Sequence, residues 1–220
     1  MGQFATFTAS GEISMEAEVS RPDRALDAPA YASYLKAERT LPPMAVLPII
    51  TAPDPRLKIQ AKPVDKVDAQ IRRLMDDMLE TMYVAPGIGL AAPQVGVAKR
   101  IIVIDVADKG ELPRPYRMAN PEIIWKSDET ATYEEGCLSV PEYYADVERA
   151  AKVRVRYLDE QNEIRELEAE GLLAVCIQHE IDHLAGTLFV DHISALKRGI
   201  ILRKLGKAKK AAEPVAVARS

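Results

Sequence analysis

The sequence of 220 residues is poor in cysteine, in histidine and in long apolar runs. Its two cysteines cannot form a disulfide framework, so we expect a reducing compartment, the cytoplasm. No apolar run approaches the roughly 18–20 residues that cross a bilayer, which argues against a membrane protein. Residues 1–43 contain no apolar signal-peptide core, and their six acidic residues fit poorly with a mitochondrial transit peptide.

The charge of the chain is distributed unevenly along its length. The chain is 48% hydrophobic and 28% charged, as soluble globular proteins are, and its net charge of −4 argues against a protein coated in nucleic acid. Residues 1–43 carry −2 and residues 197–220 carry +7, so the residues between them carry −9. We therefore expect an acidic body followed by a basic tail.

The chain divides into three expected segments. Residues 1–43 show no sustained apolar periodicity, and we expect a disordered extension there. Met44 offers an alternative translation start, in which case this extension is absent from the native protein. We expect one folded domain over 44–193, of ordinary single-domain size, and a basic helix and tail over 194–220.

The hydrophobic pattern predicts an α+β fold. Apolar residues at helical spacing predict a helix over 69–83, with Asp65 or Asp68 as its N-cap and a methionine-rich face in the core. A segment that is apolar on nearly all sides predicts a buried central helix over 171–184, and a basic helix should begin near Ser194. Strands are expected at 100–106, 120–125, 153–157 and 163–168. Antiparallel strands would then pack around the central helix, with an N-terminal helix and a C-terminal basic helix.

The strongest chemical signal lies in the predicted central helix, in the run QHEIDHLAG at residues 178–186. His179 and His183 are four residues apart, so a helix places them on one face, close enough to share a metal ion. Glu180 lies beside them, within reach of a metal-bound water. Burying two histidines and a glutamate without partners would be costly, which favours a metal site over a structural role.

A third ligand must come from an upstream segment. Metzincin proteases carry a third histidine after this motif, but Phe189 stands at that position. Thermolysin-like proteases take a glutamate from a downstream helix, but the only glutamate after His183 is Glu213 in the basic tail. The candidate is Cys137 in the run EGCLSVP, because a thiolate and two imidazoles leave a fourth position open for water. Cys176 lies three residues before His179 and either lines the site without ligating or is a small buried apolar residue.

A glycine-rich run, GIGLAAPQVG at residues 87–96, precedes the first predicted strand. It lacks the phosphate-binding pattern of a P-loop, and Pro93 would interrupt the helix that a dinucleotide fold requires. Gln94 is the one polar side chain in the run. Its carboxamide N–H groups suit a developing oxyanion, and local hydrogen bonds within the loop are the alternative role.

The runs GIGLAAPQVG, EGCLSVP and QHEIDHLAG resemble, in this order, the three signature motifs of bacterial peptide deformylases of type 1. The resemblance extends to PDPRL at 53–57 and NPEI at 120–123, and covers residues 44–205. It implies a metal-dependent hydrolase that removes the formyl group from the N-terminal formylmethionine of nascent proteins and releases formate. Residues 44–193 would be its catalytic domain.

The resemblance also implies roles for individual residues. The implied ligands of one divalent metal ion are Cys137, His179 and His183. The family implies Fe(II) as the cellular metal, with Zn, Ni or Co as replacements. Glu180 would be the general base and then the general acid, worth about 10²–10⁴ in rate. The side chain of Gln94 and the backbone N–H of Leu138 would form the oxyanion hole.

The resemblance further implies a binding surface for the peptide and for the ribosome. The positions that match the pocket for the methionine side chain are Ile88, Leu172, Val175 and Cys176. Gly89 and Gly136 match positions whose backbone pairs with the substrate peptide as an added strand. The basic C-terminal helix resembles a ribosome-docking element near the tunnel exit, with a solvated helix end as the alternative. A monomer is expected.

Two other functions fit part of the sequence. An HExxH zinc peptidase would share the metal-binding helix but would not need Cys137 as a ligand. A catalytically inactive, ribosome-associated homologue would share the fold. Such a protein would be expected to have lost a catalytic position, and this chain retains all of them.

Overall fold

The structure is a computed structural model that describes residues 44–108 and 111–212. The predictions for residues 1–43 and for the last eight residues of the tail lie outside this range. The longer helices are α2 (Ala69–Val84), α3 (Gly171–Leu184) and α4 (Ala195–Ala212), and the short 3-10 helices are η2 (Pro55–Lys58), η3 (Ala92–Val95) and η4 (Phe189–Asp191). None of the described helices combines the length and the apolar character needed to cross a bilayer.

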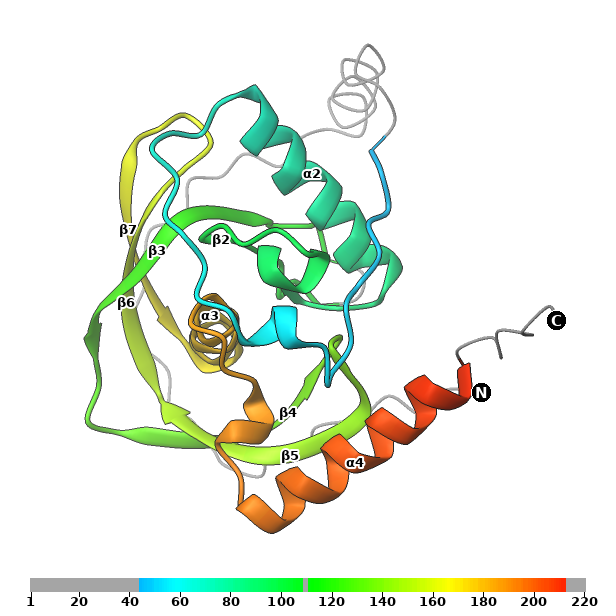
Figure 1. Cartoon of the computed structure of the whole chain (residues 1–220). Coiled ribbons are helices and arrows are strands. Elements are labelled where there is room, and N and C mark those ends of the chain that lie inside the picture. Colours follow the sequence, from blue (N-terminus) through cyan, green and yellow to red (C-terminus); the bar gives the residue numbers. More distant parts are fainter. Residues whose placement is uncertain (1–43, 109–110, 213–220) are drawn as a thin grey trace, which may run out of the picture. The chain divides into compact units, whose positions relative to one another are not determined.

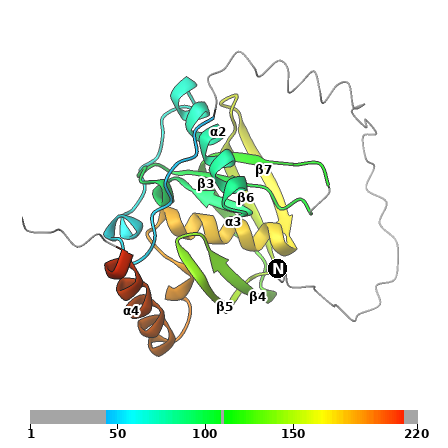
Figure 2. The same cartoon turned by 90° about the vertical axis from the view of Figure 1, so that its right-hand side faces the viewer.

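The strands form one sheet and one separate hairpin. Their bounds are β1 (Gly89–Ala91), β2 (Ile101–Ile104), β3 (Tyr116–Lys126), β4 (Thr130–Cys137), β5 (Val140–Ala150), β6 (Lys152–Leu158) and β7 (Ile164–Glu170). Five of them pair antiparallel in the order β1-β2-β3-β6-β7, and β4 pairs with β5. α3 runs between the sheet and the hairpin, end-on in Figure 1 and from the side in Figure 2. The predicted α+β fold around a central helix is confirmed.

The sheet is covered on both faces near its β1 edge. This burial explains why all four residues of β2 are apolar. Ile102 and Ile104 pack in the cluster that includes the apolar side of α3. Ile101 and Val103 point to the other face and pack in the cluster of α2 and its methionines. Because successive side chains of a strand alternate between faces, a strand buried on both faces needs an apolar residue at every position.

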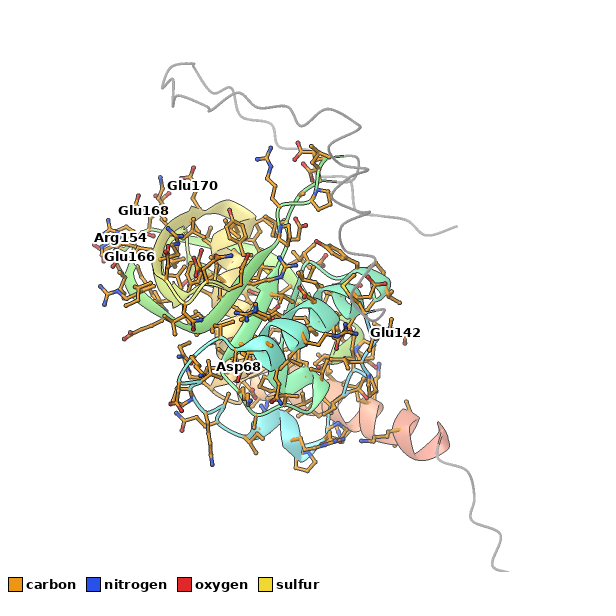
Figure 3. All side chains as sticks on the ribbon, turned by 90° about the horizontal axis from the view of Figure 1, so that it is seen from above. Asp68, Glu142, Arg154, Glu166, Glu168 and Glu170 are labelled. Carbon is orange, nitrogen blue, oxygen red and sulfur yellow. The ribbon has the colours of Figure 1, made fainter. Side chains whose placement is uncertain are left out.

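The far edge of the sheet is exposed and charged. β7 is the edge strand, and on its outward face Glu166 and Glu168 pair with Arg156 and Arg154 of β6. Figure 3 shows Arg154, Glu166, Glu168 and Glu170 together at this edge. Exposed pairs of this kind contribute little stability, about 0–1 kcal/mol each. Their charges keep the edge from pairing with another strand.

The basic helix α4 is attached to the domain by an apolar contact. Ile201 and Leu205 are each 8% exposed and belong to a cluster with Phe189 of η4 and Val140 of the hairpin. These two apolar residues, four positions apart, pack one face of α4 against the domain. The opposite, basic face remains exposed.

The hairpin β4–β5 and the short strand β1 are the parts of the sheet structure that the sequence pattern did not predict. The predicted helix over 171–184 and the four predicted strands correspond to α3, β2, β3, β6 and β7, with ends shifted by a few residues on the strands. The strands of the hairpin were not predicted because their inward side carries Glu135 and Arg149, which are both 6% exposed. Charged residues at core positions remove the apolar alternation by which a strand is recognised.

The N-cap of α2 is Asp68, not Asp65, and it gives a stability prediction. The Asp68 carboxylate accepts hydrogen bonds from the backbone N–H groups of Gln70 and Ile71, each at 2.9 Å. Replacing Asp68 with Ala should lower the free energy of unfolding by about 1 kcal/mol, because two backbone donors lose their acceptor. Urea unfolding at saturating metal measures this change. The matched control is Asp65→Ala, and an equal loss in both variants would contradict the assignment.

Candidate metal centre

Three polar side chains of α3 lie in the interior. His179, Glu180 and His183 are 8%, 3% and 1% exposed, although the helix around them is largely apolar. The two imidazole rings are one helical turn apart and meet edge to face, with their centroids 5.0 Å apart. α3 brings both rings against the hairpin, where His183 meets Cys137 and His179 meets Glu135.

Cys137 reaches the histidines from the end of β4. A two-residue turn, Leu138–Ser139, follows it and leads into β5. Its Sγ lies 3.2 Å from Nε2 of His183 and accepts a hydrogen bond from the backbone N–H of Ser139 at 3.4 Å. The ligand atoms of Cys137, His179 and His183 all lie within 4.8 Å of one another. The structure therefore brings the three candidate ligands together.

The chemistry of this cluster fits a divalent metal ion. A thiolate and two imidazoles form a donor set that suits Zn, Fe, Ni or Co. Burial lowers the pKa of His183 well below its usual value, which keeps its imidazole in the neutral form that ligates metals. The Nδ1 atom of His179 is 2.7 Å from Glu135 Oε2, which leaves Nε2 as its ligand atom.

Glu135 is held in place by a buried arginine. Its carboxylate is bound by two nitrogens of Arg149, with Nε 2.6 Å from Oε1 and Nη2 2.9 Å from Oε2. Burial alone would raise the pKa of Glu135, but the hydrogen bonds with Arg149 and His179 lower it to about 2. Glu135 is therefore a stable anion, and it accepts the Nδ1–H of His179.

Glu180 lies beside the cluster with one oxygen uncommitted. Its Oε2 atom is buried and has no hydrogen-bond partner among the residues that the structure describes. Burial raises the pKa of Glu180 to about 7. The backbone of β1 passes close by, because a Cβ built on Gly89 would lie 2.7 Å from Cys176 Sγ and still closer to Glu180 Oε1. Only glycine fits at position 89 with Glu180 in this place.

Gln94 links the glycine-rich run to the metal ligands. Its Oε1 accepts a hydrogen bond from the backbone N–H of Ala91 at 2.7 Å, which fixes the carboxamide. Its Nε2 then lies 3.6 Å from Cys137 Sγ and 3.2 Å from Ser139 Oγ. The two roles considered for Gln94 are thus compatible, since one end makes the local hydrogen bond and the other end faces the cluster.

The turn after Cys137 packs against the same run. A Cβ built on Gly87 would lie 2.8 Å from Leu138 Cδ1, so the loop backbone approaches the turn closely. Gly136, on β4, lies under the ring of Tyr144, whose Cε1 would be 2.5 Å from an added Cβ. A larger residue at either position would displace a side chain, Leu138 at position 87 or the exposed Tyr144 at position 136. The three sequence motifs therefore converge on one cluster.

Of the residues expected around a methionine pocket, Cys176 lies near Glu180, since a Cβ built on Gly89 would meet both side chains. Cys176 is buried, and its thiol donates a hydrogen bond to the backbone carbonyl of Ile88 at 3.6 Å. Val175 is also buried, whereas Ile88 and Leu172 are 43% and 45% exposed. Burial raises the pKa of the Cys176 thiol well above its usual value, so it remains protonated. The contact between Cys176 and Ile88 brings two of the four residues together, and the pocket as a whole stays a prediction.

The polar residues behind the ligands were not predicted from the sequence. Glu135, Arg149 and Asp182 received no role, although they contact one another and His179. A signal was present for Glu135, because it stands two residues before Cys137 and a strand places both side chains on one face. Arg149 gave no such signal, since nothing local in the sequence relates it to the ligands.

Comparison with known proteins gives a consistent result. A family model described as polypeptide deformylase matches residues 46–199. The peptide deformylase of Phenylobacterium zucineum is 61% identical over 169 residues, covering 77% of this chain and 100% of that protein. That of Agrobacterium fabrum is 56% identical over 168 residues, covering 76% of this chain and 99% of that protein.

Solved structures agree with this comparison. The crystal structure of a peptide deformylase from Legionella pneumophila matches with a TM-score of 0.70 and 48% identity, covering 77% of this chain and all of that one. The peptide deformylase from Ehrlichia chaffeensis in complex with actinonin matches with a TM-score of 0.73 and 45% identity, covering 76% of this chain and 99% of that one. Because these matches span the sheet, the hairpin and the helix that carry the cluster, the chain belongs to the polypeptide deformylase family.

Proposed function

We propose that this chain hydrolyses the formyl amide of N-formylmethionine at the start of new proteins and releases formate, with Cys137, His179 and His183 holding the metal ion. The observation that carries the proposal is the convergence of three motifs on one buried cluster in a member of this family. A zinc peptidase without a cysteine ligand is not favoured, because Cys137 Sγ lies 3.2 Å from His183 Nε2. An inactive homologue is not favoured either, since every catalytic side chain is retained.

Glu180 moves the proton in this reaction. A divalent metal ion held by the cluster would supply a Lewis acid for the formyl carbonyl and would make water a nucleophile near neutral pH. Glu180 accepts the proton of the attacking water on its uncommitted Oε2 and delivers it to the amine nitrogen as the carbon–nitrogen bond breaks. Its buried position keeps bulk water from competing for that proton.

Gln94 and the backbone of Leu138 stabilise the developing negative charge on the formyl oxygen. The carboxamide of Gln94 is fixed at its oxygen by Ala91, so its N–H end, which contacts Cys137 Sγ and Ser139 Oγ, is already held at the cluster where that charge develops. The backbone N–H of Leu138 belongs to the turn that directly follows Cys137, next to the ligand. Donors fixed in advance are worth roughly 2.7–4 kcal/mol each in such sites.

The peptide binds by adding a strand between β1 and β4. β1 is the terminal strand in the sheet order, and β4 pairs only with β5 among the described strands, so each has an open edge. Gly89 and Gly136 offer backbone groups there to the peptide that follows the formylmethionine. The methionine side chain then fits the apolar group formed by Ile88, Leu172, Val175 and Cys176. Main-chain pairing explains how one enzyme accepts many protein sequences.

Replacing Glu180 with Gln tests the proton transfer. The change keeps the size of the side chain but removes the base, so kcat/KM for a formyl-Met tripeptide should fall by about 10²–10⁴-fold. The metal content of the purified variant should remain that of the unchanged protein. The matched control is Glu148→Gln, an exposed glutamate on β5. Activity within threefold of the unchanged protein in fully loaded Glu180→Gln would contradict the role.

We propose Fe(II) as the cellular metal, with Zn, Ni and Co as replacements that the same ligands accept. Thiolate and imidazole ligands suit each of these ions, so selection depends on what the cell supplies. A thiolate on Fe(II) is open to oxidation by molecular oxygen, whereas the second cysteine is protected. Cys176 is buried and remains a thiol, which is far less reactive than a thiolate.

Purification without oxygen tests the metal assignment. The anaerobically purified protein should contain iron, and exposure to air should abolish activity while oxygen atoms add to Cys137. Metal analysis and peptide mass spectrometry measure both effects. Cys176 serves as the internal control and should stay unmodified, and a Ni-loaded sample should keep its activity in air. Zinc as the metal of the anaerobic protein would refute the iron assignment.

We also propose that the basic face of α4 docks on the ribosome near the tunnel exit. The exposed cations on α4 are Lys197, Arg203, Lys204, Lys207 and Lys209. Two of the helix's cations are neutralised within the chain, since Arg198 pairs with Asp191 and Lys209 pairs with Asp54. Among the described residues, no ion-pair partner exists for the other four exposed cations, Lys197, Arg203, Lys204 and Lys207, and these are available to phosphates.

Charge reversal tests the docking better than truncation does, because truncation would also remove the buried Leu205. The double change Lys204→Glu and Lys207→Glu should weaken co-sedimentation with ribosomes at low salt and leave activity on a formyl-Met tripeptide unchanged. Each lost phosphate contact reduces both the affinity and its salt dependence. The control, Lys62→Glu with Lys99→Glu, changes the net charge equally at another place. Unchanged co-sedimentation of the α4 variant would exclude the docking face.

The proposal includes the cytoplasm as the location and a monomer as the working form. Formylated chains are made where ribosomes are, and a thiolate ligand requires a reducing compartment. All the proposed ligands and catalytic groups lie within one chain. A second copy is therefore not needed to complete the site.

A further inference from the structure

One buried guanidinium joins the hairpin to the central helix. Arg149 of β5 is 6% exposed, and its Nε and Nη2 atoms bind the two oxygens of Glu135 on β4. Its remaining Nη1 atom donates to Oδ2 of Asp182 on α3 at 2.6 Å. The same side chain thus bridges two elements that are far apart in the sequence. In Figure 2 the hairpin lies along α3.

Each contact of Arg149 leads to a candidate metal ligand. Glu135 stands two residues before Cys137 on β4, and its Oε2 atom lies 2.7 Å from Nδ1 of His179. Asp182 directly precedes His183 on α3. Fixing Arg149 therefore fixes one ligand of the hairpin relative to both ligands of the helix.

The far end of this network reaches the surface. Oδ2 of Asp182 also contacts Nε2 of His192 at 2.7 Å, and the side chain of His192 is 36% exposed. Asp182 therefore has a partner on each side, the buried Arg149 and the more exposed His192. A carboxylate with two such partners has little freedom to change its rotamer.

Arginine is suited to this position for a geometric reason. Its planar guanidinium presents nitrogens in fixed directions, so it can bind one carboxylate with two hydrogen bonds and a second carboxylate with the third nitrogen. A lysine carries one ammonium group, which cannot keep both geometries at once. A methionine of similar length fills the space and leaves Glu135 as a buried anion without its guanidinium partner.

We propose that Arg149 is a positioning residue for the metal centre, holding Cys137 on the hairpin in register with His179 and His183 on α3 and holding Glu135 where it orients the His179 ring. This inference rests on the proposed ligand set. It assigns to Arg149 a role in metal affinity, separate from its contribution to the stability of the fold. Partners behind the ligands typically change metal affinity by about 10–100-fold when they are removed.

The test measures metal binding by the full-length chain, independently of activity. Zn(II) affinity is measured by competition with a chromophoric chelator, and Co(II) substitution reports on the ligands through its thiolate-to-cobalt absorption band. In Arg149→Met the dissociation constant for Zn(II) should rise by about 10–100-fold, and the thiolate band should weaken or shift. Arg149→Lys keeps the charge but loses the fork, so its dissociation constant should lie between those of the unchanged protein and Arg149→Met.

Two control variants isolate the effect of Arg149 on the metal ligands. Arg154→Met removes an arginine that pairs with Glu168 on the exposed face of the sheet, and its Zn(II) affinity should equal that of the unchanged protein. Cys137→Ser tests the ligand set itself and should abolish the thiolate band. If Cys137→Ser binds Zn(II) as tightly as the unchanged protein, the ligand set is wrong. If Cys137→Ser loses affinity and Arg149→Met does not, the ligand set stands and the positioning role of Arg149 is wrong.

A purely structural role would give a different result. It would lower the melting temperature of the metal-free and the metal-loaded forms equally, with the Zn(II) dissociation constant unchanged, and this outcome would overturn the proposal. Should Arg149→Met fail to fold by far-UV circular dichroism, Arg149→Lys decides. A raised dissociation constant in the folded lysine variant supports the positioning role, and a normal one overturns it.

Discussion

The structure depends on how a group of polar side chains is kept in the interior of an apolar core. α3 carries two imidazoles and a carboxylate to the centre of the molecule, where isolated polar groups are costly. The hairpin supplies the two imidazoles with partners, the Cys137 sulfur and Glu135, and Glu135 is in turn bound by Arg149. Each partner is buried only because the next one is present. The core and the candidate metal centre are therefore one connected set of contacts.

The layered fold follows from this arrangement. The sheet covers one side of α3 with apolar side chains, and the hairpin covers the other side with the polar ones. The glycine-rich run then enters between them, where Gly87 and Gly89 let the backbone come close to Leu138 and Glu180. The motif on α3 is therefore contacted by the other two motifs, one on the hairpin and one in the glycine-rich run. The strands that separate the motifs in the sequence lead the chain from one side of α3 to the other.

The sequence allowed much of this to be predicted, and the failures have a physical cause. α3 and β2 were predicted because continuous apolar character marks elements that are covered on both faces. The hairpin was missed because Glu135 and Arg149 occupy its inward positions. Local rules fail there because the site uses core positions for charge. The gathering of Cys137 with the histidines followed from ligand chemistry, but the contacts of Arg149 depend on tertiary structure and have no local signal.

The close approach at Gly89 has a consequence for the range of substrates. The missing side chain at this position sets the gap between the open edge of β1 and the carboxylate of Glu180. A peptide added to that edge would run its main chain past the Glu180 carboxylate, for which we propose the proton transfer, at a distance that the enzyme's own backbone determines. In the proposed pocket Ile88 and Leu172 are exposed, so changes there would alter selectivity for the first side chain without moving Glu180. The β1 backbone, along which the peptide would pair, thus lies so close to Glu180 that not even a methyl group fits between them.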